Sequence, residues 1–304
     1  MTIAVPSRPV AVTGASGELG RRVALRLASE GAAQRLVVRD AARAPSSAGE
    51  PIPGAEVAVA AGFRDQAGME AAFRGVGTVF LVSAREEADR VTTHRAAIAA
   101  AVAAGVERIV YTSFVGAASD AVFTFARDHA ATEEAIRASG LRHTFLRDNL
   151  YHLGLARMVG DDGVIRGPAG EGRVASVAHD DVADVATAVL LAADPGRHDG
   201  RAYDVTGPAP LTMAEVAEAL SSAAGRRITY HAETVDEAYA SRAGYAAPQV
   251  EVDGWVSSYT AIAAGELGVV SDAVETLAGR PAQSFVAWLG ENPAAWAHLR
   301  GTGS

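Results

Sequence analysis

The sequence predicts an α/β protein, a doubly wound parallel sheet followed by a smaller C-terminal α+β lobe. Three observations lead to this prediction. A short apolar run leads into regularly spaced glycines, apolar β-prone runs alternate with helical patterns through the first half of the chain, and the alternation fades after about residue 150. Alternation of this kind is typical of parallel strands joined by crossover helices.

The first unit is a strand, a glycine turn and a helix. Residues 10–13 form a short apolar strand, and Gly14, Gly17 and Gly20 follow at every third position. In a dinucleotide-binding turn such glycines permit a tight reversal, a close approach of the backbone to a pyrophosphate, and close packing of helix on strand. The N-terminus of the helix that begins there favours an anion. The turn therefore predicts a Rossmann-like nucleotide site.

Five further strands and three helices complete the predicted sheet. The strands are expected at residues 36–39, 56–60, 78–83, 108–112 and 143–147. The helices are expected at residues 67–73, 90–104 and 125–139. The last two helices are followed by glycines, which suit the left-handed conformation that ends many helices. Residues 42–54 are rich in proline, glycine and serine and are expected to form a surface loop.

The second half of the chain has a different pattern. Residues 149–174 are rich in glycine with little periodicity, and we expect loops over the ligand crevice. A helix at 180–193, capped by Asp180 or Asp181, is expected to pack back on the sheet. The smaller lobe is expected to hold a strand at 203–205, a helix from Thr212 to 223, a strand at 227–231, and helices at 235–242, 252–264 and 281–289.

These patterns predict two domains. Residues 1–150 form the expected NAD(P)-binding domain, and residues 151–304 form mostly a substrate lobe that covers the carboxyl ends of the strands. Residues 300–304 are expected to be a frayed tail.

Composition narrows the class of protein. The 304 residues are 49% hydrophobic and 21% charged, and no stretch approaches the length of a membrane span. The chain has no cysteine, which excludes disulfides and thiolate chemistry, and its histidines show no metal-ligand spacing. A net charge of −9 argues against nucleic acid as a partner. We expect a cytoplasmic monomer or homodimer without a metal, acting on a small molecule.

Several motifs resemble one family. The run Thr13-Gly14-Ala15-Ser16-Gly17-Glu18-Leu19-Gly20 resembles the TGxxGxxG loop of the extended and atypical short-chain dehydrogenases. Further segments resemble the NmrA-like branch of that family in the same order along nearly the whole chain, namely 38–40, 61–65, 80–83, 111–114, 139–151, 177–183 and 256–262. Within the branch, the chain is most similar to bacterial NAD(P)H:quinone oxidoreductases. The resemblance implies a nicotinamide dinucleotide but no particular substrate, because the branch contains both reductases and NADP-sensing regulators.

The resemblance also implies which residues contact the cofactor. They are Gly14, Ala15, Ser16, Gly17, Glu18, Leu19, Gly20, Arg39, Gly62, Phe63, Val82, Ser83, Ala84, Thr112, Ser113 and His129. Gly62 stands where relatives often carry an acidic residue beside the adenine. A hydroxyl of Thr112 or Ser113 resembles the serine that orients a carbonyl in the wider superfamily, although hydroxyls at strand ends more often bond local backbone.

Arg39 bears on the choice between NAD and NADP. It ends the second strand, where NAD enzymes place a carboxylate for the ribose 2′-hydroxyl and NADP enzymes often place an arginine. Asp40 follows directly, so either preference can be argued, and Arg43 could add a second cation. We expect NADP(H) to be preferred, with NAD(H) as the alternative.

The usual catalytic pair of the superfamily is missing. The resemblance aligns its Tyr-x-x-x-Lys motif with Phe125-Ala126-Arg127-Asp128-His129, so the tyrosine acid is absent and His129 stands where the lysine would hold the ribose. Tyr151 is the nearest substitute for the missing phenol, and a packing aromatic of the pocket wall is an equal alternative. The catalytic candidates are therefore Tyr151 and His129. The acceptor-binding candidates are Phe114, Asn149 and Tyr151.

The missing tyrosine favours one kind of acceptor. Hydride transfer to a simple ketone produces a basic alkoxide that needs a positioned acid, whereas a quinone produces a delocalised anion that water can protonate. The leading prediction is an NAD(P)H-dependent reductase of a small conjugated acceptor such as a quinone. The alternative is a non-catalytic NADP-sensing regulator that binds a protein partner. An epimerase is disfavoured, because no Tyr-Lys pair is present to move the proton.

Overall fold

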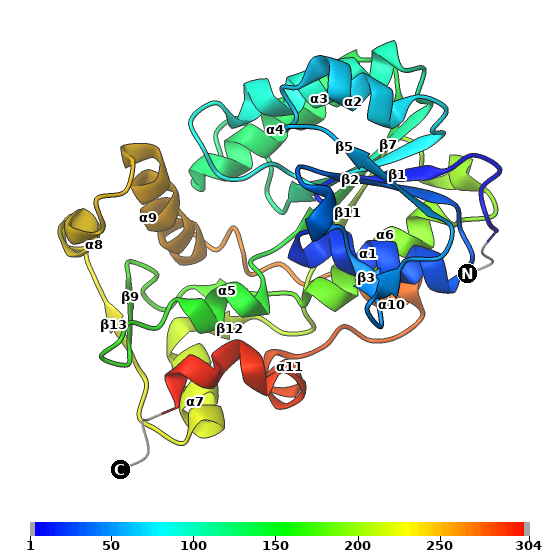
Figure 1. The fold of residues 1–304 in the computed structure, drawn as a ribbon. Coiled ribbons are helices and arrows are strands. Elements are labelled where there is room, and N and C mark those ends of the chain that lie inside the picture. Colours follow the sequence, from blue (N-terminus) through cyan, green and yellow to red (C-terminus); the bar gives the residue numbers. More distant parts are fainter. Residues whose placement is uncertain (1–3, 301–304) are drawn as a thin grey trace.

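The computed structural model describes residues 4–300, and Figure 1 shows a layered α/β body with a smaller group of elements beside it. The body is built on one sheet of seven parallel strands in the order β11-β8-β7-β6-β1-β2-β5. Its strands are β1 (Val10–Val12), β2 (Gln34–Val38), β5 (Ala55–Val59), β6 (Thr78–Leu81), β7 (Arg108–Phe114), β8 (Arg142–Asp148) and β11 (Arg201–Val205). The strand order reverses between β1 and β6, so ligands are expected at the carboxyl ends of these strands. The predicted fold class is confirmed.

Helices cover both faces of the sheet. One face carries α1 (Glu18–Ser29), α6 (His179–Leu190) and α10 (Ala273–Ala278), and the other carries α2 (Gln66–Phe73), α3 (Arg90–Ala103) and α4 (Thr124–Ala138). A separate apolar cluster fills each interface. On the α1 side the predicted apolar face of the helix, Leu19, Val23 and Leu27, is buried against the sheet.

The helix predicted at 180–193 packs back on the sheet as expected, but its predicted cap is wrong. The helix begins at His179 with Ala178 as its N-cap, and no side chain caps it. Asp180 instead pairs with Arg22 and Arg26 of α1, at 3.2 and 2.8 Å. The carboxylates in the first turn therefore join α6 to its neighbours rather than to its own N-terminus.

The strand predicted at 203–205 belongs to the main sheet and not to the smaller lobe. It is β11, which pairs in parallel with β8 over five residues, from Arg201 opposite Thr144 to Val205 opposite Asp148. Because α6 lies on the sheet, the chain that leaves it returns to the free edge of β8. Edge strands are buried less completely than central ones, and β11 is exposed at its first two residues.

The smaller lobe contains short elements from distant parts of the chain. Its helices are α5 (His152–Arg157), α7 (Met213–Ala224), α8 (Val235–Arg242), α9 (Gln249–Ala263) and α11 (Phe285–Glu291). Its strands are β9 (Val164–Gly167), β10 (Arg173–Val174), β12 (Leu211–Thr212) and β13 (Thr229–Ala232), which form the parallel pair β9–β13 and the antiparallel pair β10–β12. The prediction of loops at 149–174 is therefore wrong in part, because α5, β9 and β10 lie there.

Several predicted boundaries in this lobe are confirmed. Thr212 caps α7 with Glu215 in a reciprocal capping box, and α8 has its predicted limits.

The remaining segments of the described chain are irregular or short. The segment predicted as a surface loop at 42–54 is mostly irregular, with a short hairpin of β3 (Ser46–Ser47) and β4 (Glu50–Pro51). Single 3-10 turns complete the described chain: η1 (Ala41–Arg43), η2 (Pro195–His198), η3 (Ala243–Tyr245) and η4 (Pro293–Leu299). Most of the predicted frayed tail, residues 301–304, lies outside the described residues.

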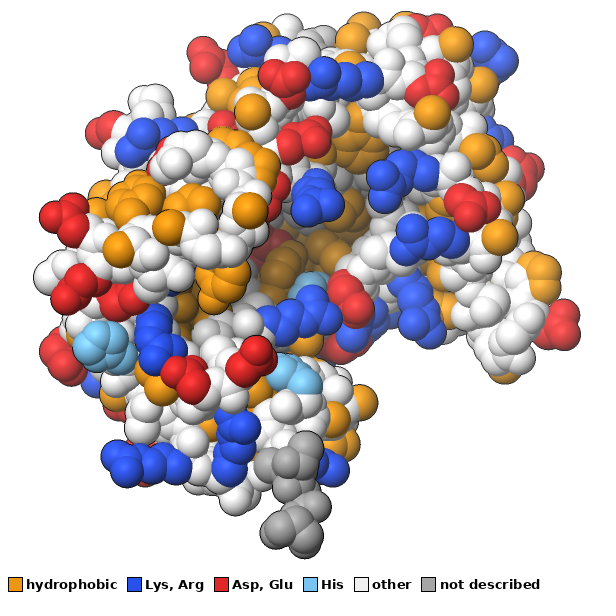
Figure 2. All heavy atoms as spheres, turned by 60° about the vertical axis from the view of Figure 1, so that its left-hand side comes forward, with side chains coloured by type: hydrophobic (Ala, Val, Ile, Leu, Met, Phe, Trp, Pro, Cys, Tyr) orange, Lys and Arg blue, Asp and Glu red, His pale blue; other side chains and the backbone are white. Residues whose placement is uncertain are grey.

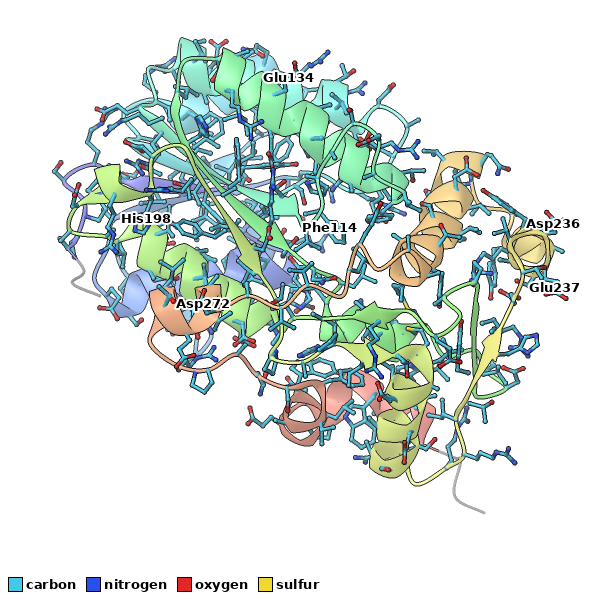
Figure 3. All side chains as sticks on the ribbon, turned by 180° about the vertical axis from the view of Figure 1, so that it is seen from behind. Phe114, Glu134, His198, Asp236, Glu237 and Asp272 are labelled. Carbon is cyan, nitrogen blue, oxygen red and sulfur yellow. The ribbon has the colours of Figure 1, made fainter. Side chains whose placement is uncertain are left out.

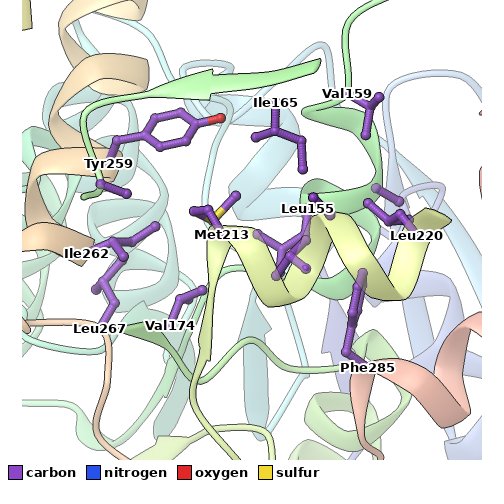
Figure 4. Close-up of a cluster of buried hydrophobic side chains, with 14 of the residues drawn as sticks. Leu155, Val159, Ile165, Val174, Met213, Leu220, Tyr259, Ile262, Leu267 and Phe285 are labelled. Carbon is purple, nitrogen blue, oxygen red and sulfur yellow. The ribbon is translucent and has the colours of Figure 1, made fainter. Parts of the chain in front are cut away.

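One apolar core joins the smaller lobe to the sheet. Leu155, Met213 and Ile262 pack together beside Tyr259 (Figure 4), and the same buried cluster continues to Phe114 at the end of β7. Phe114 lies where the sheet meets the smaller lobe (Figure 3). Across residues 4–300, none of the helices has the length and apolarity needed to cross a membrane.

Candidate functional site

A cavity of about 300 Å³, here called the central pocket, opens where β6, β7 and β8 end against the smaller lobe. Six residues predicted for the site line it: Glu18, Ser83, Phe114, His129, Asn149 and Tyr151. Ten residues that were not predicted also line it: Glu86, Arg90, Phe123, Asp148, Leu150, Leu153, Gly154, Arg157, Met158 and His179. The crevice therefore lies at the edge of the sheet that the topology indicates.

The glycine turn presents unpaired backbone donors at the start of α1. Within the described residues, the N–H groups of Glu18, Leu19 and Gly20 donate no hydrogen bond to the protein. Gly14 has φ +57°, and a methyl group on Gly20 would overlap the carbonyl oxygen of Gly14. A helix of twelve residues that begins with free N–H groups behind a glycine cradle fits a dinucleotide pyrophosphate.

The two charged residues after β2 differ in their local contacts. The carboxylate of Asp40 accepts a hydrogen bond of 3.0 Å from the N–H of Ala42 and so caps the 3-10 turn η1. Arg39 is exposed and makes no ion pair within residues 4–300. Because the carboxylate is engaged locally, the free guanidinium is the group available to an anion beside this strand.

Several predicted cofactor residues organise the strand ends. The hydroxyl of Thr112 accepts a 2.8 Å hydrogen bond from the N–H of Ser83, and the N–H of Ala84 donates to Nε2 of His94 at 2.7 Å. Val82 lies against Gly14 of the turn. The ring centroids of Phe63 and His94 are 6.5 Å apart. Gly62 has φ +159°, and within the described residues a methyl group there would meet nothing closer than 4 Å apart from its chain neighbours. Their cofactor contacts stay predictions.

Ser113 is placed away from the central pocket. It is fully buried, and its hydroxyl donates a 2.7 Å hydrogen bond to Glu133 of α4. Burial opposes ionisation of Glu133, but hydrogen bonds from Arg147 and Ser113 hold the pKa of this carboxyl below its usual value. The serine therefore contributes to a buried ion-pair network between α4 and β8.

His129 lines the central pocket with both ring nitrogens already engaged. Nη2 of Arg90 lies 3.0 Å from Nε2, and the hydroxyl of Tyr111 lies 2.8 Å from Nδ1. Burial and the neighbouring Arg90 hold the pKa of His129 well below its usual value, so the ring is neutral. An arginine can only donate, so Nε2 accepts and the Nδ1 proton points to Tyr111. Neither nitrogen is free for a ribose hydroxyl in this arrangement.

Arg90 is a buried cation without a carboxylate partner. Its side chain is 3% exposed, its Nε donates to the carbonyl of Ala84, and it takes part in no ion pair within residues 4–300. Its Nη1 has no hydrogen-bond partner among the described residues. Glu86, Asp128 and Asp148 interact with its charge at longer range. A buried guanidinium that no carboxylate contacts is costly, and it is expected where a ligand or a reaction supplies further negative charge.

Asp148 and Tyr151 form a coupled pair at the end of β8. The phenol of Tyr151 donates a short hydrogen bond to Oδ2 of Asp148, and its ring stacks on His179 with centroids 3.7 Å apart. Burial raises the pKa of Asp148 to about 7, against the opposing effects of Tyr151 and Arg90. Burial and the nearby Asp148 also raise the pKa of Tyr151. Near neutral pH the pair can therefore hold or release a proton beside the pocket.

Phe125, in the position of the superfamily tyrosine, does not line the central pocket. It is 2% exposed, packs edge-on against Phe123, and lies so close to Gly254 of α9 that a methyl group there would overlap its ring. The guanidinium carbon of Arg90 is 5.7 Å from its ring centroid. This position therefore joins α4 to α9 instead of facing the acceptor.

Asn149 serves the backbone. Its amide nitrogen donates to the carbonyl of Leu267 at 2.9 Å, and its amide oxygen accepts from the N–H of Leu150 at 2.8 Å. The residue lines the central pocket, but both groups of its side-chain amide form hydrogen bonds that hold the chain after β8. Within residues 4–300, no three His, Asp or Glu side chains gather closely enough to hold a metal ion.

Sequence reasoning missed Asp148 and Arg90. Asp148 had a usable signal, since an aspartate at the carboxyl end of a buried central strand is a candidate for a perturbed pKa. Arg90 had none, because its partner His129 lies on another helix and 39 residues further along the chain.

The fold and the glycine turn define a Rossmann-type dinucleotide-binding protein. The sequence matches the NmrA-like family over residues 6–247, and the chain belongs to this family. The predicted family is confirmed.

Relatives of known activity extend the comparison. The chain is 33% identical to an NAD(P)H azoreductase of Xenophilus azovorans, over 94% of this chain and 99% of the relative. It is 36% identical to a (4-alkanoyl-5-oxo-2,5-dihydrofuran-3-yl)methyl phosphate reductase of Streptomyces griseus, over 95% and 99%. A solved NADPH-dependent quinone oxidoreductase of Escherichia coli, complexed with NADPH, has a TM-score of 0.82 and 30% identity over 93% of this chain and 99% of its own. The predicted class, an NAD(P)H-dependent oxidoreductase, agrees with all three.

The regulator alternative has weaker support. The transcriptional regulator NmrA in complex with NADP superposes with a TM-score of 0.72 but only 18% identity, over 93% of this chain and 94% of that one. A likeness at this level shows a shared fold and no more.

Proposed function

We propose that the protein is an NADPH-dependent reductase of small conjugated acceptors, with quinones as the leading example. The observation that carries this proposal is the Asp148–Tyr151 pair beside the buried guanidinium of Arg90, whose Nη1 has no hydrogen-bond partner among the described residues, at the pocket where the sheet ends. Phe125 offers no acid, so the acceptor is one whose reduced form is a stabilised anion. We also propose that the sheet with its helices binds the cofactor and that the smaller lobe completes the acceptor site.

The residues present fit an NADP cofactor. The free N–H groups at the start of α1 would hold the pyrophosphate, and Arg39 would hold the 2′-phosphate. Ser83 lines the central pocket without a side-chain partner among the described residues and would face the nicotinamide end. When bound, the cofactor supplies the hydride that reduces the acceptor.

Named relatives support a conjugated acceptor. Their names refer to an azo compound, a quinone and an unsaturated lactone with an acyl group. These compounds share a conjugated system that takes up two electrons and leaves charge on an electronegative atom. A pocket with a fixed positive charge and a phenol donor suits that product.

The chain's own residues then stabilise and protonate the product. The positive potential of Arg90 lowers the energy of the anion that develops in the central pocket. A protonated Asp148 can donate to the phenol oxygen of Tyr151, which frees the phenol hydrogen to donate to the acceptor oxygen. His179, stacked on the phenol, holds the ring in place. The proton thus passes from Asp148 through Tyr151 to the anion after it has formed, a step that water can also complete, so hydride transfer itself still requires an acceptor whose anion is stabilised.

We further propose a cytoplasmic monomer or homodimer that binds no nucleic acid. The net charge of −9 supports the last point, because nucleic acid binding relies on clustered positive charge.

The test is turnover by the purified protein. With NADPH and 2-methyl-1,4-naphthoquinone, the absorbance of NADPH should fall at a rate proportional to protein concentration. Tyr151→Phe should lower kcat by roughly 3- to 10-fold, since the phenol assists a step that water can complete. Loss of all acceptor reduction, with NADP⁺ and NADPH bound at clearly different affinities, would contradict the proposal and favour the regulator.

A further inference from the structure

A second and larger cavity, here called the outer pocket, lies in the smaller lobe. Its volume is about 720 Å³, and it is enclosed by the end of α5, by β9, and by α8, η3 and α9. Figure 2 shows a hollow on this face of the molecule with arginine side chains around it. The volume is in the range of pockets that hold drug-sized ligands.

The charged side chains that line the outer pocket are all positive. Of the described residues, Arg157, Arg166 and Arg242 line it, and no Asp or Glu does. This is unexpected in a chain with a net charge of −9. Two of these arginines form ion pairs, Arg166 with Asp162 at 2.6 Å and Arg242 with Glu233 at 2.9 Å.

Arg157 is the arginine of this pocket that remains uncompensated. It ends α5, its side chain is exposed, and within residues 4–300 it makes neither an ion pair nor a side-chain hydrogen bond. The guanidinium therefore presents its full fork of donors to a ligand. Carboxylate, sulfonate and phosphate oxygens are the groups that such a fork binds best.

Aromatic side chains form the rest of the wall. Tyr245 and Trp255 meet edge to face with ring centroids 6.1 Å apart, and Tyr259 lies deeper, with the guanidinium carbon of Arg242 at 5.5 Å from its ring. Tyr245 is 70% exposed, so a large aromatic surface stands at the rim with little protein covering it. Rings of this kind favour a flat aromatic ligand.

The outer pocket adjoins the central pocket. Arg157 and Met158 line both cavities. A ligand whose reducible group lies beside Tyr151 can therefore extend past Arg157 into the larger space. The central pocket of about 300 Å³ holds little more than the reacting groups, so the remainder of a larger acceptor extends into an adjoining space. A cavity of about 450 Å³ also shares Ser83, Glu86 and Arg90 with the central pocket, but Glu86 and Glu251 line it, so an anionic group favours the larger outer pocket.

We propose that the outer pocket is a subsite for the anionic aromatic end of the acceptor, bound by the free guanidinium of Arg157 and by the rings of Tyr245 and Trp255. The inference rests on the proposed reductase function for the identity of the ligand. Preferred substrates are thus conjugated acceptors that carry a carboxylate, sulfonate or phosphate on an aromatic group, remote from the reducible bond.

Binding of an anionic dye tests the subsite without turnover. Fluorescence titration of the purified protein gives the dissociation constants of 8-anilinonaphthalene-1-sulfonate and of its uncharged analogue N-phenyl-1-naphthylamine. Saturating NADP⁺ is present throughout to fill the cofactor site. We expect Arg157→Gln to weaken the sulfonate about tenfold and the uncharged analogue less than twofold, and Arg157→Lys to restore part of the loss.

Two control variants separate charge from shape. Arg201→Gln removes another exposed arginine that makes no ion pair in the described chain, and it should change neither constant. Tyr245→Ser should weaken both dyes, because it removes a ring that each would contact. Equal binding of the sulfonate by the wild type and by Arg157→Gln would overturn the inference.

Turnover distinguishes failure of this inference from failure of the proposed function. With NADPH, Arg157→Gln should lower the kcat/KM ratio of 1,4-naphthoquinone-6-sulfonate, whose anion lies on the fused benzene ring, to 2-methyl-1,4-naphthoquinone about tenfold, mainly through KM. An unchanged ratio in an active variant contradicts the subsite and leaves the reductase function standing. A wild type that reduces neither quinone contradicts the function, while the dye measurements still decide the pocket.

Discussion

At the scale of single residues, burial of one carboxyl group determines what the central pocket can do. Asp148 ends a central strand, is 6% exposed, and has its pKa raised to about 7 by that burial. An aspartate in water is ionised near neutral pH and gives up its proton far too readily to serve as a reserve of protons. Here the fold keeps the proton within reach of Tyr151.

The raised pKa of Asp148 predicts a pH-dependent cost to stability. The pKa of Asp148 is about 7 in the folded state and lower in the unfolded state, so its carboxyl group binds a proton more tightly in the folded protein. The resulting contribution of Asp148 to the free energy of unfolding is fully present below about pH 4 and is lost as pH rises through 7. Urea unfolding of Asp148→Asn should show the wild type losing up to about 4 kcal/mol relative to this variant between those values. The exposed Asp161→Asn serves as control, and an identical pH dependence in the two variants would contradict the assignment.

Arg39 predicts cofactor preference. Because Asp40 caps η1 and Arg39 is free, Arg39→Ala should weaken NADPH binding by roughly 1.5–3 kcal/mol, the scale of a charged hydrogen bond, while NADH binding changes little. Calorimetric titration with each cofactor gives both values, and Arg201→Ala is the matched control at the opposite edge of the sheet. Equal losses for NADPH and NADH would show that the 2′-phosphate lies elsewhere.

At this scale the sequence indicates residues that line the central pocket, and their roles stay predictions. Glycine spacing and the resemblance indicated the cofactor turn, and Tyr151 was identified as the substitute phenol. His129 was identified by its slot, but its contacts depend on Arg90 and Tyr111, which no local pattern connects to it. A single sequence does not show which side chains of two helices far apart in the chain contact each other.

At the scale of elements, the missing tyrosine has a structural reason. Helix α9 approaches α4 closely at Gly254, and Phe125 fills the space between them. The same helix carries Trp255 into the outer pocket. The aromatic residue at position 125 therefore sets the position of a wall of the outer pocket.

Gly254→Ala should disturb this contact. Overpacking costs about 1–3 kcal/mol and better helix propensity returns about 1. Because the methyl group would overlap the ring of Phe125, we expect a net loss near the upper limit, about 2 kcal/mol in the free energy of unfolding. The double variant with Phe125→Leu should recover much of that loss. Gly290→Ala, in a helix where a methyl group meets nothing, should be neutral or stabilising. Unimpaired stability of Gly254→Ala would mean that α9 packs less closely.

Prediction of elements succeeded where periodicity is local. The strands of the first half and helix α7 carry their own apolar pattern, and α7 and α8 both begin with a capping box. Helix α5 has six residues and β9 has four, too few for a period, and both bury their apolar side chains against α7 and α9 from later in the chain. Their structure follows from tertiary packing, which local pattern does not contain.

At the scale of the whole molecule, the central pocket lies where the sheet ends against the smaller lobe, and the outer pocket adjoins it within that lobe. Alternation of strand and helix predicted the sheet, but it could not show that the chain returns to the sheet at β11 after the first excursion. That return depends on α6 packing beside α1, where Arg26 pairs with Asp180 and Asp184. The two lobes are therefore interleaved in sequence.

The central claim is that this molecule reduces conjugated acceptors because it stabilises an anion without a tyrosine acid at position 125. The most direct measurement is the ratio of kcat/KM with NADPH for 1,4-benzoquinone and for 1,4-cyclohexanedione, a matched pair that differs in conjugation, after subtraction of the non-enzymatic rate. We predict that the quinone is preferred by at least about 1,000-fold, the scale of general acid catalysis that a simple ketone would require. Comparable turnover of the saturated diketone would contradict the account.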